Sequence, residues 1–270
     1  MYFGEMGKSE AVPKSIVEEF IKVALMAKPL LPKHVDGKQA IMAMKNQGSK
    51  NWRQMEWIGF WFEFFIQNEI QPKLGNTSGP KYGNTIFDIK LEYVWDLKAH
   101  PNHKDDLLLN DQEAVRFCIR DNGGVGFIIV EGTVEYDDEN ETFKNWHDAL
   151  KGKQSKYVTE RIARNAPSRR RKTGFTPTSI VGIWVDSLNT LIQGEDDGWI
   201  SGFQENMRNS NGNPRRAKFK FNTSKIPASC VAGRIQLYLL ESLINLSCTG
   251  LDSGTSKSDK SIESVLARLS

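Results

Sequence analysis

The chain of 270 residues is 39% hydrophobic and 26% charged, with a formal net charge of +3 at pH 7. These values are ordinary for a folded globular protein and argue against a collagen-like or intrinsically disordered chain. Apolar runs such as WIGFWF are far too short to cross a bilayer, and the N-terminal segment lacks the layout of a signal peptide. Three scattered cysteines indicate reduced thiols, so we expect a cytoplasmic protein with no membrane contact.

The first third of the chain is predicted to be mainly helical. Apolar residues spaced three and four apart predict a helix over residues 15–27, and a second helix is expected over 37–45. A long aromatic helix is expected over 51–72, where Pro72 ends it, followed by a loop rich in Gly, Pro and Asn. Residues 85–100 are rich in β-branched and aromatic side chains and predict one or two strands.

Beyond residue 100 the pattern alternates between turns, helices and strands. We expect a turn over 100–108, then a helix over 109–124 capped by Asn110 or Asp111 and ended by Gly123. An apolar run over 125–136 predicts a strand with both faces covered. A helix over 142–164, a strand within 179–191 and an amphipathic helix over 235–247 complete the prediction of one α/β domain with insertions.

The distribution of charge is more informative than its total. Residues 161–185 and 206–240 contain no acid but many Lys and Arg residues, whereas 131–141 form an acidic run. A single run of this kind is usually a solvated loop, but two basic runs that also carry Asn and Gln indicate a surface for a polyanion. The sequence therefore favours nucleic acid as the partner.

Charged residues also interrupt the strand-like segment TIFDIKLEYVWDLKAH. Asp96 and Lys98 are two residues apart, so on a strand they project from the same face, and Asp88 lies eight residues earlier in the same register. Two carboxylates beside an ammonium can hold Mg²⁺ and act on a phosphodiester. The simpler alternative is an Asp96–Lys98 salt bridge at an exposed sheet edge, with Asp88 near Asp96 only if the chain bends or two strands pair.

The segment resembles the PD-(D/E)XK nuclease superfamily. The resemblance lies in Asp88 followed by the Asp-x-Lys of Asp96 and Lys98, with an aromatic helix before them and a helix and an apolar strand after them. The resemblance covers roughly residues 51–135 and implies an αβββαβ core with a mixed central sheet flanked by helices. It departs from the family where Phe87 replaces a frequent proline and where KLEY, between the two acids, lacks a turn signal. Length and basic loops look most like a type II restriction endonuclease, which implies Mg²⁺, double-stranded DNA and a homodimer.

The resemblance also implies roles for particular residues. Asp88, Asp96 and Lys98 would be catalytic, and a glutamate of the preceding helix would join the metal, with Glu56 favoured over Glu63. The core would span about 51–190, a DNA-contact or dimerisation region about 200–248, and a flexible tail 249–270. The residues expected to contact DNA are Arg169, Arg170, Arg171, Lys172, Arg208, Arg215, Arg216 and Lys218.

Other chemistries remain open at this point. His100 and His103 form an H-x-x-H pair suited to zinc, but no second ligand pair has zinc-like spacing. His147 could serve as a general base, although a helical histidine is more often structural. The surviving alternatives to a restriction enzyme are a repair or junction nuclease and a nucleic-acid-binding protein whose Asp-x-Lys is only an ion pair.

Overall fold

The computed structural model describes residues 11–75, 77, 86–152, 159, 163–165, 169–208 and 212–238. The chain divides into two units, Met1–Leu237 and Tyr238–Ser270. Almost all of the second unit lies outside the described residues, including the predicted tail 249–270 and most of the predicted helix 235–247. The fold below is therefore that of the first unit.

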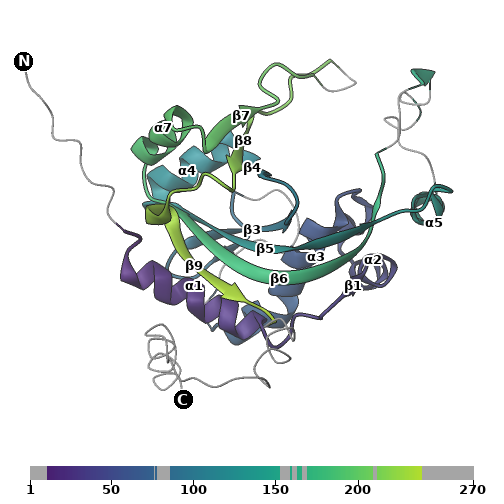
Figure 1. Cartoon of the computed structure of the whole chain (residues 1–270), viewed down its shortest axis with the longest axis horizontal. Coiled ribbons are helices and arrows are strands. Elements are labelled where there is room, and N and C mark those ends of the chain that lie inside the picture. Colours follow the sequence, from purple (N-terminus) through teal and green to yellow (C-terminus); the bar gives the residue numbers. More distant parts are fainter. Residues whose placement is uncertain are drawn as a thin grey trace, which may run out of the picture. The chain divides into compact units, whose positions relative to one another are not determined.

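A curled mixed sheet organises the first unit (Figure 1). Its main path runs β1 (Val35–Asp36), β6 (Lys172–Val185), β5 (Val125–Tyr136), β3 (Val94–Pro101) and β2 (Ile89–Lys90), and β9 (Val231–Gln236) also pairs with β6. β3 and β5 are parallel, whereas the other pairs are antiparallel. Parallel neighbours need a long crossover, which α4 (Gln112–Asn122) provides between β3 and β5.

A second, smaller sheet packs over one face of the first. It has the order β4 (Asp106–Asp111), β8 (Lys218–Asn222) and β7 (Ile200–Phe203). Apolar side chains of this sheet and of α4 form one buried cluster with Phe127, Ile129, Val181 and Ile183 of the large sheet. Burial on both faces explains the nearly continuous apolar sequence of β5 and β6.

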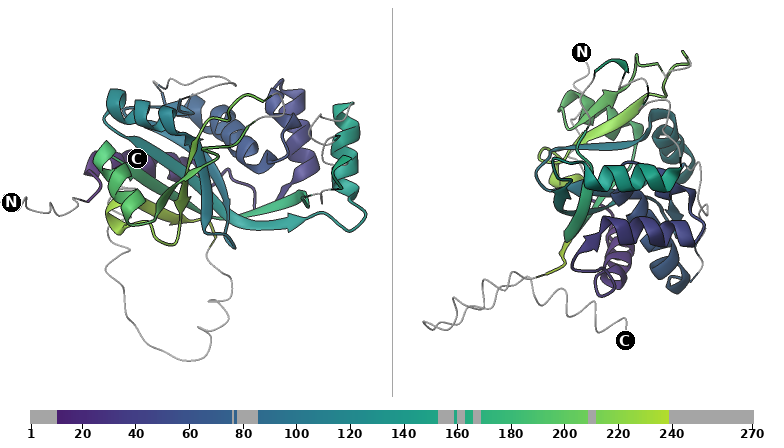
Figure 2. Two further views of the ribbon diagram at one scale, coloured as in Figure 1. Left: turned by 90° about the horizontal axis from the view of Figure 1, so that it is seen from above. Right: turned by 90° about the vertical axis from the view of Figure 1, so that its right-hand side faces the viewer.

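Helices pack against both sheets. α1 (Lys14–Ala27) packs on β9 and β6, where Gly182 and Gly233 leave room for the ring of Phe20. α2 (Gly37–Asn46) contacts β6, α3 (Trp57–Phe65) lies against β3, and α5 (Thr142–Lys151) follows β5. α7 (Leu188–Asp196) packs on β7, and Figure 2 shows these helices from two further sides. No helix in the described ranges is long and apolar enough to span a membrane.

The predicted α/β class with a mixed sheet is confirmed, and several predicted elements appear close to their predicted ends. The long helix over 51–72 is wrong as a single element, because the segment folds as η1 (Lys50–Arg53), α3, the π-turn η2 (Ile66–Ile70) and η3 (Gln71–Lys73). The late helix is also wrong at its start, since Ile235 and Gln236 pair with β6. A remaining short 3₁₀ turn, η4 (Ala228–Cys230), leads into β9.

Candidate active site

A tight hairpin between β2 and β3 brings Asp88 next to Asp96. Ile89 faces Trp95 across the two antiparallel strands, and the amide of Asp88 donates to the carbonyl of Trp95 at 3.0 Å. One carboxylate oxygen of Asp88 accepts the amide of Leu97 at 2.7 Å. The two acids could meet only if the chain bent or two strands paired, and the pairing of β2 with β3 meets this condition.

The hairpin turn is held by a residue distant in the sequence. The carboxylate of Glu19 on α1 accepts the amides of Glu92 at 2.9 Å and Tyr93 at 3.1 Å, and the indole Nε1–H of Trp95 at 2.7 Å. Side-chain acceptors can satisfy turn amides in place of local turn residues. The segment KLEY therefore forms a turn without a local turn signal.

Asp96 and Lys98 form a buried ion pair. β3 lies between β2 and β5, and the side chains of Asp96 and Lys98 are only 2% and 17% exposed. Their contact is direct, with the ammonium of Lys98 against Oδ2 of Asp96. This position rules out the alternative of a salt bridge on an exposed sheet edge.

Asn110 at the end of β4 bridges the same two groups. Its Nδ2 donates to Oδ1 of Asp96 at 2.8 Å, and its Oδ1 accepts from Nζ of Lys98 at 3.1 Å. The sequence suggested only a helix cap at this position. Asp111 is the N-cap residue of α4, but its carboxylate makes no capping bond and instead pairs with Arg216 and Lys218. An asparagine before a helix carries no local signal for a bridging role, so sequence reasoning missed it.

The electrostatics of the cluster are those of carboxylates crowded in a poorly hydrated place. Burial raises the pKa of Asp88 well above its usual value, and the charge of Asp96 raises it further. Burial alone would lower the pKa of Lys98, but the carboxylates of Asp96 and Asp88 outweigh it and the pKa is raised. Crowding and burial favour the protonated form of such a carboxyl. A metal cation can take the place of the proton, because its positive charge offsets the repulsion between the neighbouring carboxylates.

The glutamate nearest this cluster is Glu63 rather than Glu56. Burial raises the pKa of Glu63, and the charges of Lys98 and Asp96 also act on it, whereas its Oε1 accepts from Nε2 of Gln67 at 3.2 Å. Glu56 precedes α3 and pairs with Lys172 at 2.5 Å. Both glutamates line the same cleft, but only Glu63 acts on the pKa values of Asp88 and Lys98, so the geometry favours Glu63 over Glu56 as the further acid of this cluster.

A cleft of about 1180 Å³ opens above these residues. Asp88, Asp96, Lys98 and Glu63 line it together with Asn110. Further along, the lining includes a group of cations: Lys104, Arg169, Lys172, Arg216 and Lys218. Four of the eight residues predicted to contact DNA thus share one cleft with the carboxylates.

The other four predicted DNA contacts are placed differently. Arg170 donates to the carbonyl of Asp137, with Nη2 at 2.5 Å, and Arg171 is 5% exposed, so it does not face a groove. Arg208 lies on the β7–β8 connection and donates to the carbonyl of Gly212 at 2.9 Å. Arg215, on the same connection, donates its amide to Met207. Arg171 therefore lies apart from the cleft, because its side chain turns inward toward Asp148 of α5.

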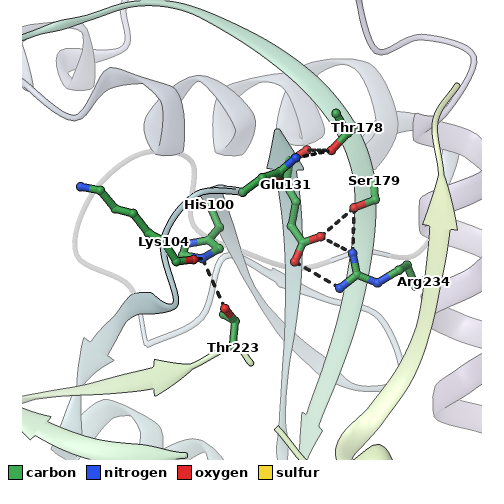
Figure 3. Close-up of polar contacts among 8 residues, drawn as sticks. His100, Lys104, Glu131, Thr178, Ser179, Thr223 and Arg234 are labelled. Atoms are coloured by element: carbon green, nitrogen blue, oxygen red, sulfur yellow. Dashed lines mark hydrogen bonds and ion pairs between the residues drawn. The ribbon is translucent and has the colours of Figure 1, made fainter. Parts of the chain in front are cut away.

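A polar network surrounds Glu131 of β5, which lies opposite His100 of β3 (Figure 3). The carboxylate of Glu131 accepts from Ser179 at 2.7 Å and from the guanidinium of Arg234, which joins β5, β6 and β9. Arg234, although it lies in the second basic run, is therefore committed to the sheet. His100 contacts the carbonyl of Lys104 at 2.6 Å in the same view.

The two histidines of H-x-x-H do not share a ligand position. His103 contacts the hydroxyl of Tyr136 at 3.2 Å, whereas His100 is buried against Lys104. His147 is also buried, and its Nε2 lies 2.8 Å from the carbonyl of Trp52, so its role is structural. The described ranges contain no group of three or more His, Cys, Asp or Glu side chains arranged for a metal ion.

Mg²⁺ does not require such a group, because it is commonly held by one or two carboxylates plus substrate phosphates and water. Asp88 and Asp96 supply those carboxylates at the floor of an open cleft, so the donor set fits this ion. No protein-family model, no curated protein and no solved structure matches this chain.

Proposed function

We propose that the chain is a Mg²⁺-dependent endonuclease of the PD-(D/E)XK type that hydrolyses phosphodiester bonds in double-stranded DNA. The observation that carries the proposal is the convergence of Asp88, Asp96 and Lys98 at the floor of a cleft that also contains cations. Among such nucleases a homodimeric, cytoplasmic type II restriction enzyme agrees best with the chain length and the basic loops.

The connectivity around the site supports the same proposal. The first acid precedes β2, the second acid and the lysine lie on the antiparallel neighbour β3, and α4 then leads to the parallel strand β5. The resemblance implies an acid on one strand, an acid and a lysine on the next, and a helix that crosses to a parallel strand, and this local connectivity supports the proposal. A fold alone does not specify a function, so the support comes from the side chains that line one cleft, Asp88, Asp96 and Lys98.

Each residue of the cluster has a chemical task in this proposal. Asp88 and Asp96 would hold Mg²⁺, which polarises the phosphoryl oxygen and lowers the pKa of bound water. The ammonium of Lys98, held by Asp96 and Asn110, would face the negative charge that develops on the phosphate. Asn110 fixes the orientation of both charged side chains, which reduces the reorganisation needed during the reaction.

The cations along the cleft would hold the DNA backbone. Arg216 and Lys218 both pair with Asp111, and the Arg216 side chain is 72% exposed and free to swing toward a phosphate. Lys172 pairs with Glu56 on another part of the lining. Phosphate contacts of this kind position a duplex without reading its sequence.

Plasmid cleavage with and without Mg²⁺ tests the proposal. Asp96→Asn and Lys98→Ala should each reduce the cleavage rate by roughly 10²-fold or more, the order lost when one electrostatic stabiliser is removed. Lys90→Ala is a matched control, because Lys90 lies on the same hairpin but bonds to Asn122 outside the cleft. Discrete fragments would indicate a site-specific enzyme, whereas smearing would favour a repair or less specific nuclease.

Duplex binding by Asp96→Asn protein separates an enzyme from a binding protein. A double variant, Arg216→Ala with Lys218→Ala, should weaken binding and reduce the slope of affinity against salt by about one for each phosphate that the protein no longer neutralises. Binding without any Mg²⁺-dependent cutting by wild-type protein would favour a non-enzymatic nucleic-acid-binding protein. Full activity of both Asp96→Asn and Lys98→Ala would refute the active-site assignment.

A further inference from the structure

In the described part of the chain, a buried arginine outside the cleft, Arg171, has one ion-pair partner, Asp148, at 3.8 Å. Arg171 immediately precedes β6 and is 5% exposed, and within the described ranges its Nε and Nη1 meet no hydrogen-bond acceptor. A guanidinium remains protonated in proteins, so it cannot escape burial by losing its charge. A buried charge without partners is costly, and such a group in a folded protein requires an explanation.

The carboxylate that pairs with Arg171 is already engaged by another cation. Oδ1 of Asp148 lies 3.8 Å from Nη2 of Arg171 and 3.2 Å from Nζ of Lys151, whose side chain is 17% exposed. Burial lowers the pKa of Lys151, and the positive charges of Arg171 and Arg53 lower it further in spite of Asp148. Two cations, Arg171 and Lys151, therefore share one carboxylate, and the charge of Arg53 in η1 is close enough to act on Lys151.

The geometry defines a site separate from the cleft. Lys172 lines the cleft and pairs with Glu56, whereas the preceding residue, Arg171, reaches toward Asp148 on α5. Successive residues of an extended strand point to opposite sides, which accounts for this difference. Figures 1 and 2 show α5 beside the ends of β5 and β6. Arg53 is exposed and stacks on Trp52, its guanidinium carbon 4.7 Å from the ring centre, so its charge borders solvent.

We propose that Arg171 and Lys151, with Arg53 on the solvent side, bind a phosphate group. Phosphate offers several strong acceptor oxygens and a charge that would balance the excess of cations, and a guanidinium fork matches its geometry. The proposal does not depend on nuclease activity. The phosphate belongs either to a free phosphorylated small molecule or to the backbone of a bound duplex.

Titration of inorganic phosphate into the full-length protein, at ionic strength held constant with sodium chloride, tests the site. Tryptophan fluorescence is a suitable signal, because the guanidinium of Arg53 lies over the ring of Trp52. Saturable binding is expected. Arg171→Met should weaken it by about 10- to 100-fold, since a hydrogen bond to a charged group is worth roughly 1.5–3 kcal/mol and 1.4 kcal/mol is tenfold.

Two further variants keep the test decisive. Arg53→Gln changes an exposed side chain and so should fold normally, and it should also weaken phosphate binding. Arg120→Gln, at an exposed position of α4, should leave phosphate binding unchanged. Arg171→Met should also retain or gain thermal stability in phosphate-free buffer, because it removes an under-compensated buried charge.

Competition with a duplex that lacks terminal phosphates identifies the source of the ligand. If phosphate binds and Arg171→Met also lowers the affinity of the protein for the duplex, the site takes a backbone phosphate. If phosphate binds and the duplex affinity is unaffected, the site takes a free phosphorylated molecule. Absence of saturable phosphate binding, or binding that Arg53→Gln and Arg171→Met leave unchanged, would overturn the proposal.

Discussion

Replacement of Asn110 by leucine would remove both polar interactions of the bridge while keeping a side chain of similar size. Oδ1 of Asp96 would lose a donor at 2.8 Å and Lys98 would lose an acceptor at 3.1 Å. Each such bond to a charged group is worth roughly 1.5–3 kcal/mol, so the two together set an upper limit of about 6 kcal/mol. The Asp96–Lys98 ion pair remains and leucine gains apolar burial, and we therefore expect a decrease of about 2–4 kcal/mol in unfolding free energy.

Asn122→Leu is the matched control, because Asn122 accepts a single hydrogen bond, from Lys90 at 2.9 Å, away from the cleft. That bond is partly exposed, so its removal should lower the unfolding free energy by about 1 kcal/mol or less. Urea unfolding followed by tryptophan fluorescence measures both variants, with an unchanged m-value as the sign that the transition is comparable. If Asn110→Leu and Asn122→Leu agree within about 0.5 kcal/mol, the bridge contributes nothing and the reasoning fails.

Three further predictions concern stability. Burial lowers the pKa of His147 from 6.5 to about 4, so between these pH values the folded state binds fewer protons than the unfolded state. As pH falls from 6.5 to 4, the unfolding free energy of the wild type should therefore decrease by up to about 3 kcal/mol relative to His147→Gln. Parallel profiles of unfolding free energy against pH for the two proteins would contradict this. Gly126→Ala would place a methyl group 2.1 Å from the ring of Trp95 and should lower the unfolding free energy, measured with denaturant, by about 3 kcal/mol. Gly59→Ala is the control on a helix with open space around the added methyl group, and it should raise the unfolding free energy by about 1 kcal/mol. Glu19→Gln should cost roughly 1.5–3 kcal/mol in the same assay, since an amide cannot accept all the donors that the carboxylate accepts; an effect below 0.5 kcal/mol would exclude the proposed anchoring of the hairpin.

The sequence was most informative where local patterns decide local structure. Periodic apolar residues predicted α1, and the apolar run over 125–136 predicted β5 with both of its ends. The spacing of Asp96 and Lys98 was sufficient to place both side chains on one face of a strand, because side chains alternate along an extended chain.

It was least informative where an interaction joins distant parts of the chain. The break of the 51–72 segment into 3₁₀, α and π pieces has no strong local breaker before Pro72. Glu56 and Glu63 are both acids of that segment, and only the position of α3 against β3 turns Glu63 toward the cluster. Likewise Arg170, Arg171 and Lys172 are adjacent cations, yet they meet Asp137, Asp148 and Glu56 respectively.

By itself, then, the sequence determined the α/β class, the strand that carries Asp96 and Lys98, and the two basic runs. Those properties depend on composition and on the two- and 3.6-residue periods, which neighbours along the chain define. Only the tertiary structure decided that Asp88 meets Asp96, because the hairpin turn is satisfied by Glu19 from α1. It alone decided that Asn110 bridges the ion pair and that Arg171 is buried, since the partners of both lie on other strands and helices, and such pairings leave no periodic trace in the sequence.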